Sequence, residues 1–351
     1  MNLPAEHDDA QEQLREVERT ARPRLTAGML AAGVAVLLFS FVLSVSLGAA
    51  NIDFLTVWEA MWRMGAGSQE HQIIWGIRLP RVIGAAMVGA AFAVAGAVMQ
   101  GMTRNPLADS GLLGINAGSA FALSLCFALL PELPYIYLVM FSFAGAALGA
   151  AMVYGIGSLS RGGLAPIRLV LAGAAVSALL GALSEGIALY FNTGQDLAFW
   201  YSGGVSGTRW SHLAVIGPWL LAALAAVIAM SRSVTILSLG EETAVGLGEN
   251  VARVKLAGMI IVVVLAGLAV AVVGAVSFVG LIVPHVARRI VGYDYRLIIP
   301  TSAVFGAVFV TLADLAARIL NPPYEIPIGA VIALVGIPFF LYVAGKGERG
   351  I

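Results

Sequence analysis

The charged residues that could bind another group are few in this chain, and arginines are the most informative of them. Arg78 and Arg81 stand on either side of Pro80. Arg318 follows Asp314 by four residues, which is the spacing of a local ion pair on one helix. A guanidinium presents a planar fork of N–H donors, so it can hold a carboxylate through two hydrogen bonds at once. The spacing therefore predicts a carboxylate–guanidinium pair between Asp314 and Arg318, and spacing alone assigns no partner to Arg78 and Arg81.

The sequence contains no residue set with the pattern of a catalytic or metal centre. His285, next to Pro284, has no second His, Cys or Met at ligand spacing, so we expect it to pack or to form a hydrogen bond. Cys126 is the single cysteine and lies in an apolar run, where we expect a packed side chain. No G-x-x-x-x-G-K-[S/T] segment occurs, so the chain has no P-loop for ATP. We expect no catalytic residue, no metal and no cofactor bound by this chain.

The composition indicates that lipid surrounds most of the chain. Of 351 residues, 60% are hydrophobic and 11% are charged, whereas soluble domains carry about 25% charged residues. The 41 glycines suit helices that pack closely in a membrane. Glu185, inside the apolar run Leu169–Phe191, would be costly in lipid and should face a pathway or a partner. The net charge of zero gives no sign of nucleic-acid binding.

Apolar runs predict an all-α, polytopic membrane protein. A helix needs about 20 residues to cross the hydrocarbon core, and helices satisfy their own backbone groups there. The run Leu256–Pro284 is too long for one straight helix. Gly274, Gly280 and Pro284 within it predict an outgoing span and a shorter one that returns to about Gly292. Counted in this way, there are ten spans. The other runs are Leu25–Ala50, Val82–Thr103, Leu112–Leu130, Tyr135–Ser160, Leu169–Phe191, Leu213–Met230, Leu297–Ala313 and Ile326–Ala344.

Basic residues predict the orientation. With the N-terminus inside, fifteen of the 20 Lys and Arg residues are cytoplasmic and five are external, which is the bias expected of cytoplasmic loops. Residues 1–24 and 346–351 are then cytoplasmic tails, and residues 25–345 form the transmembrane domain of a multi-pass protein of the inner or plasma membrane. Arg78 and Arg81 face outward against this trend. Snorkelling of their side chains to lipid head groups would account for this position.

One charged cytoplasmic connection stands out in the pattern of its small residues. Residues 238–255, named the coupling segment below, read SLGEETAVGLGENVARVK. Gly246 and Gly248 predict a sharp turn between two short helices, because glycine reaches positive φ at low cost. From composition alone, a solvated loop is the alternative.

Several longer stretches resemble, in the same order, the FecCD family of permeases. The resemblance covers nearly all of residues 25–345 and implies the type II ABC importer permease fold. It implies a second permease subunit, identical or homologous, and two cytoplasmic ATPases that use ATP and Mg. An extracytoplasmic substrate-binding protein completes such an importer. The stretches are RLPRVIGAAMVGAAFAVAGAVMQGMTRNPLADSGLLGINAGSA (78–120), IRLVLAGAAVSAL (167–179), LGEETAVGLG (239–248), VSFVGLIVPHVARRIVG (276–292), and LADLAARIL with EIPIGAVIALVGIPFF (312–340).

The resemblance implies roles for individual residues at both membrane faces. Arg78, Arg81 and Arg318 are similar to family residues that meet acidic residues on the two lobes of the binding protein. Residues 239–248 match the family's coupling helices, which sit in a cleft of the ATPase. The residues expected to form this contact are Gly240, Glu241, Glu242, Ala244, Val245, Leu247 and Gly248.

Two further assignments concern the pathway. Ala165, Pro166 and Ile167 match the family's cytoplasmic gate, for which a plain turn is the alternative because proline favours the first turn of a helix. Glu185 is a candidate for a pathway residue.

The sequence therefore predicts the permease subunit of an iron–siderophore ABC importer that works by alternating access. A haem or cobalamin importer is an alternative. An ion-coupled secondary transporter is a second one, but it would need buried acids or broken helices, and only Glu185 lies well inside a predicted span.

Overall fold

The computed structural model describes residues 11–18, 21–47, 57, 69–159, 166–322 and 324–347, and their regular structure is entirely helical. Within these residues, seven helices are long and apolar enough to cross a membrane and two shorter apolar ones accompany them. Helix α13, of 13 residues, stands where the shorter returning span was expected. The elements are α2 (Pro23–Ser46), α4 (Gln69–Ile73), the π-helix η1 (Ile74–Arg78), α5 (Leu79–Thr103), the 3-10 helix η2 (Ser110–Leu113), α6 (Ile115–Leu129), α7 (Tyr135–Leu159), α8 (Pro166–Tyr190), α9 (Gly194–Ser202), α10 (Trp210–Leu239), α11 (Glu241–Gly246), α12 (Val251–Val273), α13 (Val279–Val291), α14 (Tyr295–Ile319) and α15 (Ile328–Gly347).

Helix α5 forms the centre of the bundle and packs against α10, α12, α13 and α14. Glycines make this close packing possible, as expected for helices in lipid. A Cβ on Gly96 would lie 1.9 Å from the Gly280 carbonyl oxygen of α13, and a Cβ on Gly89 would lie 2.2 Å from the Gly306 oxygen of α14. Backbone therefore meets backbone at these two crossings, and no larger residue fits.

The long apolar run 256–284 divides into two helices, as predicted. Helix α12 ends at Val273, and Gly274 caps it with φ +82°, a conformation that favours glycine. Helix α13 begins at Val279 and ends where Gly292 takes φ +93°. The chain reverses at Gly274, whereas Pro284 lies inside α13.

Several helices extend beyond the apolar runs that predicted them. Helix α10 continues to Leu239, although its apolar run ends at Met230. Ser231 and Thr235 satisfy their hydroxyls by donating to backbone carbonyls one turn earlier. Apolar length predicts where a helix crosses the bilayer, but polar residues of this kind let it project further.

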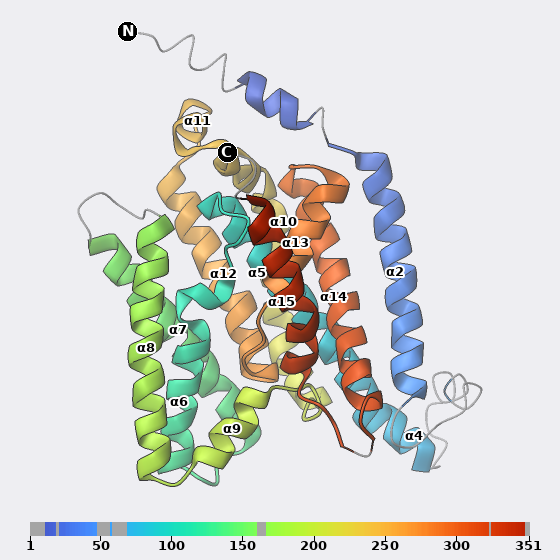
Figure 1. Cartoon of the computed structure of the whole chain (residues 1–351). Helices are drawn as coiled ribbons and strands as arrows, with labels where there is room; N and C mark the ends of the chain where they lie inside the picture. The colour runs from blue at the N-terminus through green and yellow to red at the C-terminus, as the bar shows by residue number, and fades with distance from the viewer. Residues whose placement is uncertain are drawn as a thin grey trace.

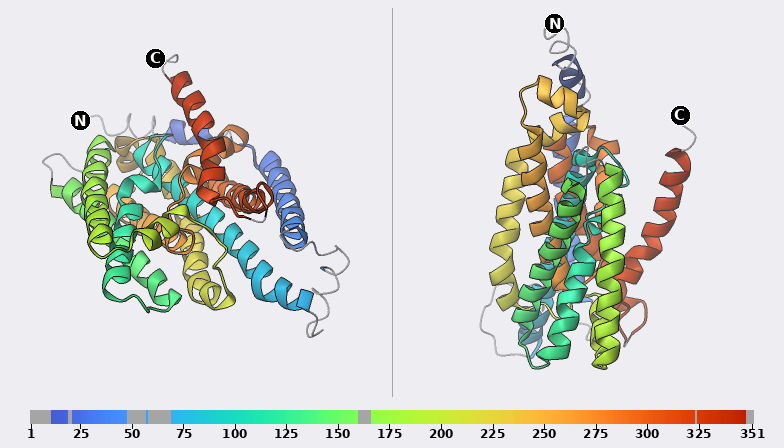
Figure 2. Two further views of the ribbon diagram at one scale, coloured as in Figure 1. Left: turned by 60° about the horizontal axis from the view of Figure 1, so that its bottom comes forward. Right: turned by 90° about the vertical axis from the view of Figure 1, so that its left-hand side faces the viewer.

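The two ends of the bundle carry different elements. The start of α2, helix α11 and the end of α15 lie at one end, whereas α4 and α9 lie at the other (Figure 1). An even number of spans requires the start of the first helix, α2, and the end of the last helix, α15, to lie on the same side of the membrane. Helix α15 leans away from the bundle (Figure 2), and on it Leu334 is 75% exposed.

Part of the predicted N-terminal tail is helical and contacts the bundle. Leu14 packs against core residues, and Glu18 forms an ion pair of 2.9 Å with Arg296 at the start of α14. The Gln13 side chain accepts a hydrogen bond of 3.4 Å from Thr243 of α11. The described part of the tail, residues 11–18, therefore lies against the same end as the coupling segment.

Candidate docking and coupling sites

The three predicted arginines lie together at the end of the bundle opposite α11. Arg78 ends η1, Arg81 lies in the first turn of α5, and Arg318 lies in the last turn of α14. Each has only 6% to 9% of its surface exposed. Buried cations require partners, and the partners found here come from α2, α14 and the loop that follows α14. Arg78, Arg81, Arg318, Asp314 and Glu325 are named the outer arginine cluster below.

Arg81 binds two carboxylates with its whole guanidinium. Its Nε donates to both oxygens of Asp314 at 3.1 Å, and its Nη2 donates to Asp314 Oδ1 at 2.8 Å. The outer edge binds Glu325, with Nη1 to Oε1 at 2.8 Å and Nη2 to Oε2 at 3.0 Å. The Asp314 side chain is 2% exposed, whereas that of Glu325 is 47% exposed.

Arg318 and Arg78 bind the C-terminal end of α2. The Nη1 of Arg318 donates to the Leu47 oxygen at 3.3 Å, its Nη2 donates to Ser44 Oγ, and its Nε lies 3.4 Å from Asp314 Oδ2. Arg78 donates to the carbonyls of Val45 and Ser46. The local Asp314–Arg318 pair predicted from spacing is therefore present. The presence of this pair does not test whether the three arginines also bind a partner protein.

Sequence reasoning assigned no role to Glu325, although it lies in one of the stretches that resemble the family. The loop between α14 and α15 brings it back over α5, and the Ile326 N–H donates to the Ala317 oxygen to hold that loop. Arg81 and Glu325 are far apart along the chain, so spacing alone carries no signal that they meet.

The coupling segment forms one short helix, α11, instead of two. Gly240 before it has φ +139°, and Gly248 after it has φ +83°. The next helix, α12, begins directly at Val251, where the Asn250 side chain accepts a hydrogen bond of 3.1 Å from the Arg253 N–H. The turn at Gly248 therefore joins α11 to a membrane span.

Helix α11 is anchored by one face and exposes the other. Ala244 is fully buried and Leu247 packs against the core, whereas Val245 is 64% exposed. Glu241 and Glu242 are exposed in the first turn, and Glu241 forms an ion pair of 2.6 Å with Lys255. Of the predicted contact residues, Ala244 supports the helix from below, and Val245 and the two glutamates form its outer surface.

A chain of buried and half-buried polar contacts connects α5 and α13 to the end of α10 that lies next to α11. Gln100 of α5 donates to the Gly280 oxygen of α13 at 3.1 Å and accepts from Arg288 at 2.9 Å. Arg288 also donates to the Tyr295 hydroxyl at 3.1 Å, and the Tyr295 N–H donates to Thr235 Oγ1 at 2.9 Å. Thr235 lies in the last turn of α10, next to α11. The sequence analysis missed this chain because its members come from four helices.

The predicted gate lies largely outside the described residues. Ala165 is not among them, and Pro166 begins α8, but nothing is described of the Pro166 and Ile167 side chains. Glu185 is exposed on α8, five residues before its end at Tyr190. Burial raises the pKa of the Tyr201 phenol on α9, and the nearby Glu185 charge adds to the rise.

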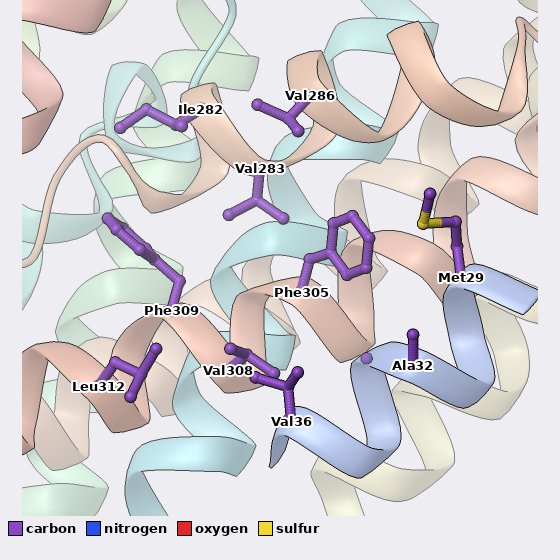
Figure 3. Close-up of a pocket in the computed structure, with 11 residues that line it drawn as sticks. Met29, Ala32, Val36, Ile282, Val283, Val286, Phe305, Val308, Phe309 and Leu312 are labelled. Atoms are coloured by element: carbon purple, nitrogen blue, oxygen red, sulfur yellow. The ribbon is translucent and has the colours of Figure 1, made fainter. Parts of the chain in front are cut away.

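Two other features lie apart from these surfaces. The His285 ring packs edge-on against Phe339 at 5.6 Å, and its nitrogens have no hydrogen-bond partner among the described residues. A cavity of about 410 Å³ between α2, α13 and α14 is lined by apolar side chains, among them Phe305 and Phe309 (Figure 3). The lining side chains offer no group that would bind a polar chelate. No group of three or more His, Cys, Asp or Glu residues in the described part of the chain could hold a metal.

Helices long and apolar enough to cross a membrane define a multi-pass membrane protein, and comparison with known sequences identifies its family. Residues 36–346 match the FecCD transport family, and the chain belongs to that family. It is 48% identical over 347 residues to the iron(3+)-hydroxamate import system permease protein FhuB of Bacillus subtilis (strain 168). That alignment covers 99% of this chain and 90% of the relative.

Two further comparisons agree with this family. The hemin transport system permease protein HmuU of Yersinia pestis is 37% identical over 335 residues, which cover 92% of this chain and 96% of the relative. A solved structure of a metal-chelate type ABC transporter in an inward-facing conformation superposes with a TM-score of 0.77 at 27% identity. It covers 93% of this chain and 100% of its own. The resemblance to the FecCD family found in the sequence is confirmed.

Proposed function

We propose that this chain is the permease subunit of an ATP-driven importer of iron–siderophore complexes. The observation that carries the proposal is the 48% identity, over nearly the whole chain, to an iron(3+)-hydroxamate import permease. The lower identity of 37% to a hemin permease makes haem the second candidate. Substrate enters from a binding protein outside, and the pathway opens to one side at a time.

Energy comes from partner subunits. Two ATPases bind ATP and Mg and act on the coupling segment, in which α11 presents Val245, Glu241 and Glu242. The polar chain from Thr235 to Gln100 supports this role, since it runs from the end of α10 next to α11 to helices α5 and α13. A movement of α11 passes to α10, which packs against it, and from α10 to α13 through these hydrogen bonds.

A second permease subunit, identical or homologous, completes the pathway. Helix α8 supports this proposal, because Leu171 is 65% and Leu189 is 79% exposed on it, and Glu185 is exposed with them. A carboxylate is costly against lipid, so a partner or an aqueous pathway covers it. In this arrangement, residues 165–167 at the start of α8 form the cytoplasmic gate.

The binding protein docks at the outer arginine cluster. Arg78, Arg81 and Arg318 lie at the end of the bundle opposite α11, and guanidinium forks suit carboxylates on the two lobes of such a protein. The cluster carries three positive and two negative charges, so an acidic partner is attracted to it.

The substrate assignment is tested with the complete importer in proteoliposomes. We expect ferric hydroxamate, delivered by the cognate binding protein, to accumulate inside and to stimulate ATP hydrolysis. Haemin and cobalamin, each tested with the same binding protein, serve as competitors and should do neither. Uptake of haemin without uptake of any ferric siderophore would contradict the iron–siderophore assignment and favour the second candidate.

A further inference from the structure

Glu325 is held by Arg81 although nearly half of its side chain faces solvent. Both of its oxygens accept hydrogen bonds from the outer edge of the guanidinium, at 2.8 and 3.0 Å. These bonds lower the pKa of the Glu325 carboxyl below its ordinary value, so it is an anion at neutral pH. An exposed acid thus occupies the edge of Arg81 that points out of the bundle.

The two carboxylates on Arg81 differ in how easily they can leave. Asp314 is 2% exposed and also lies 3.4 Å from Arg318, so its removal would leave two buried cations with one fewer partner, which is costly. Glu325 is 47% exposed and can exchange Arg81 for water. Exposed ion pairs contribute little net stability, so Glu325 is the replaceable one.

The contacts described for the other two arginines are of a different kind. Arg78 donates to main-chain carbonyls at the end of α2, and Arg318 donates to Leu47, Ser44 and the buried Asp314. The Nη1–Nη2 edge of Arg81 is therefore an exchangeable position in the outer arginine cluster.

We infer that Glu325 occupies the position on Arg81 that a carboxylate of the extracytoplasmic binding protein takes when it docks. The inference rests on the proposed docking function and adds its contact atoms, the chemistry required of the partner and the group that is displaced. The partner must present an Asp or Glu side chain to the Nη1–Nη2 edge of Arg81, and Glu325 swings into solvent as it arrives. Glu325 is thus an intramolecular competitor that weakens docking.

The test compares Glu325→Gln with Glu132→Gln. Glu132 lies in the turn between α6 and α7, so the control removes the same charge at the same membrane face without touching Arg81. The affinity of the cognate binding protein is measured on the importer in nanodiscs. We expect Glu325→Gln to bind roughly twofold to fivefold more tightly, which is the range that an exposed ion pair supplies. Glu132→Gln should bind as the wild type does.

Two results separate a failure of this inference from a failure of the docking proposal. Arg81→Lys keeps the charge but loses the fork, so it should weaken docking if the cluster is the docking site at all. Weaker docking of Arg81→Lys together with unchanged or weaker docking of Glu325→Gln would overturn the displacement of Glu325 alone. Unchanged docking of Arg81→Lys, Arg78→Lys and Arg318→Lys would overturn the docking proposal itself. Because Glu325 is half exposed, its Gln variant should fold, and its melting temperature checks this.

Discussion

The outer arginine cluster and helix α11 present opposite kinds of surface. In the cluster, Arg78, Arg81 and Arg318 are each at most 9% exposed and bind groups of this chain. On α11, Val245 is 64% exposed and Ala244 is buried beneath it. A partner at the outer end must therefore exchange contacts that already exist, whereas a partner at the cytoplasmic end can add contacts to the exposed Val245.

This difference has consequences for affinity. Exchange of one carboxylate for another yields little net energy, so docking at the outer end should be reversible and sensitive to charge. Burial of an exposed apolar side chain yields energy in proportion to area, so the ATPase contact should be the more permanent one. A binding protein that delivers substrate repeatedly needs reversible docking, and an ATPase that transmits force needs a lasting contact.

The largest expected effect comes from a substitution in the helix packing that supports both surfaces. Gly96→Val should prevent normal folding, at a cost above about 3 kcal/mol, because its Cβ would meet the Gly280 backbone. Gly28→Val on α2 is the matched control, since nothing lies within 4 Å of its Cβ position. The yield of monodisperse protein and its melting temperature measure the effect. Equal stability of the two variants would show that the α5–α13 crossing is looser than described.

A second change breaks the buried side of the outer arginine cluster. Asp314→Asn leaves Arg81 and Arg318 buried beside a neutral group and should cost about 3 to 5 kcal/mol. At the cytoplasmic end, Glu241→Gln breaks a pair in which the glutamate is 48% exposed, and it should cost less than about 1 kcal/mol. Denaturation of both variants in detergent compares them. Similar losses would remove the contrast between the two surfaces.

The third prediction changes binding at α11 without affecting the fold. Replacing both Glu241 and Glu242 with Arg should reduce copurification of the ATPase at least tenfold, because two exposed acids of the contact surface become cations. The matched control reverses Glu132 and Asp196, and it should retain the ATPase. If the α11 variant still bound the ATPase and transported normally, the coupling assignment would be wrong.

The smallest expected effect is a dependence on pH at the outer end. The pKa of Glu325 is lowered from 4.5 by Arg81, so this pair contributes its full stability above about pH 5 and loses it as the pH falls through the lowered value. Glu325→Gln should be slightly less stable than the wild type at pH 7, and this difference should shrink as the pH falls through the lowered pKa. Melting temperatures across this range test the prediction, and a gap that widens toward acid would contradict it.

The bilayer made much of this fold predictable. Apolar runs predicted the number of spans and the division of residues 256–284 into an outgoing and a returning helix, because a helix in lipid has a fixed minimum length. The structure then places the reversal at Gly274. The end of α10 that projects beyond its apolar run, Ser231–Leu239, was not predicted. Its hydroxyls donate to backbone carbonyls of the same helix, so polar residues there end the apolar run without ending the helix.

The contacts at the candidate sites were likewise predictable only in part. Asp314 and Arg318 were paired by helical spacing, which depends on one helix alone. The contacts of Arg81 with Glu325, and of Arg288 with Gln100, depend on how separate helices pack, and a single sequence contains no signal for that. The gate at residues 165–167 stays a prediction.

Transport by the purified chain tests the central claim most directly, namely that it forms a pathway and supplies no energy. Proteoliposomes that contain the permease alone should not accumulate ferric hydroxamate against its gradient, with or without proton and sodium gradients. Addition of the ATPases, the binding protein and ATP with Mg should start accumulation. Sustained accumulation by the permease alone, driven by a proton or sodium gradient, would contradict the account.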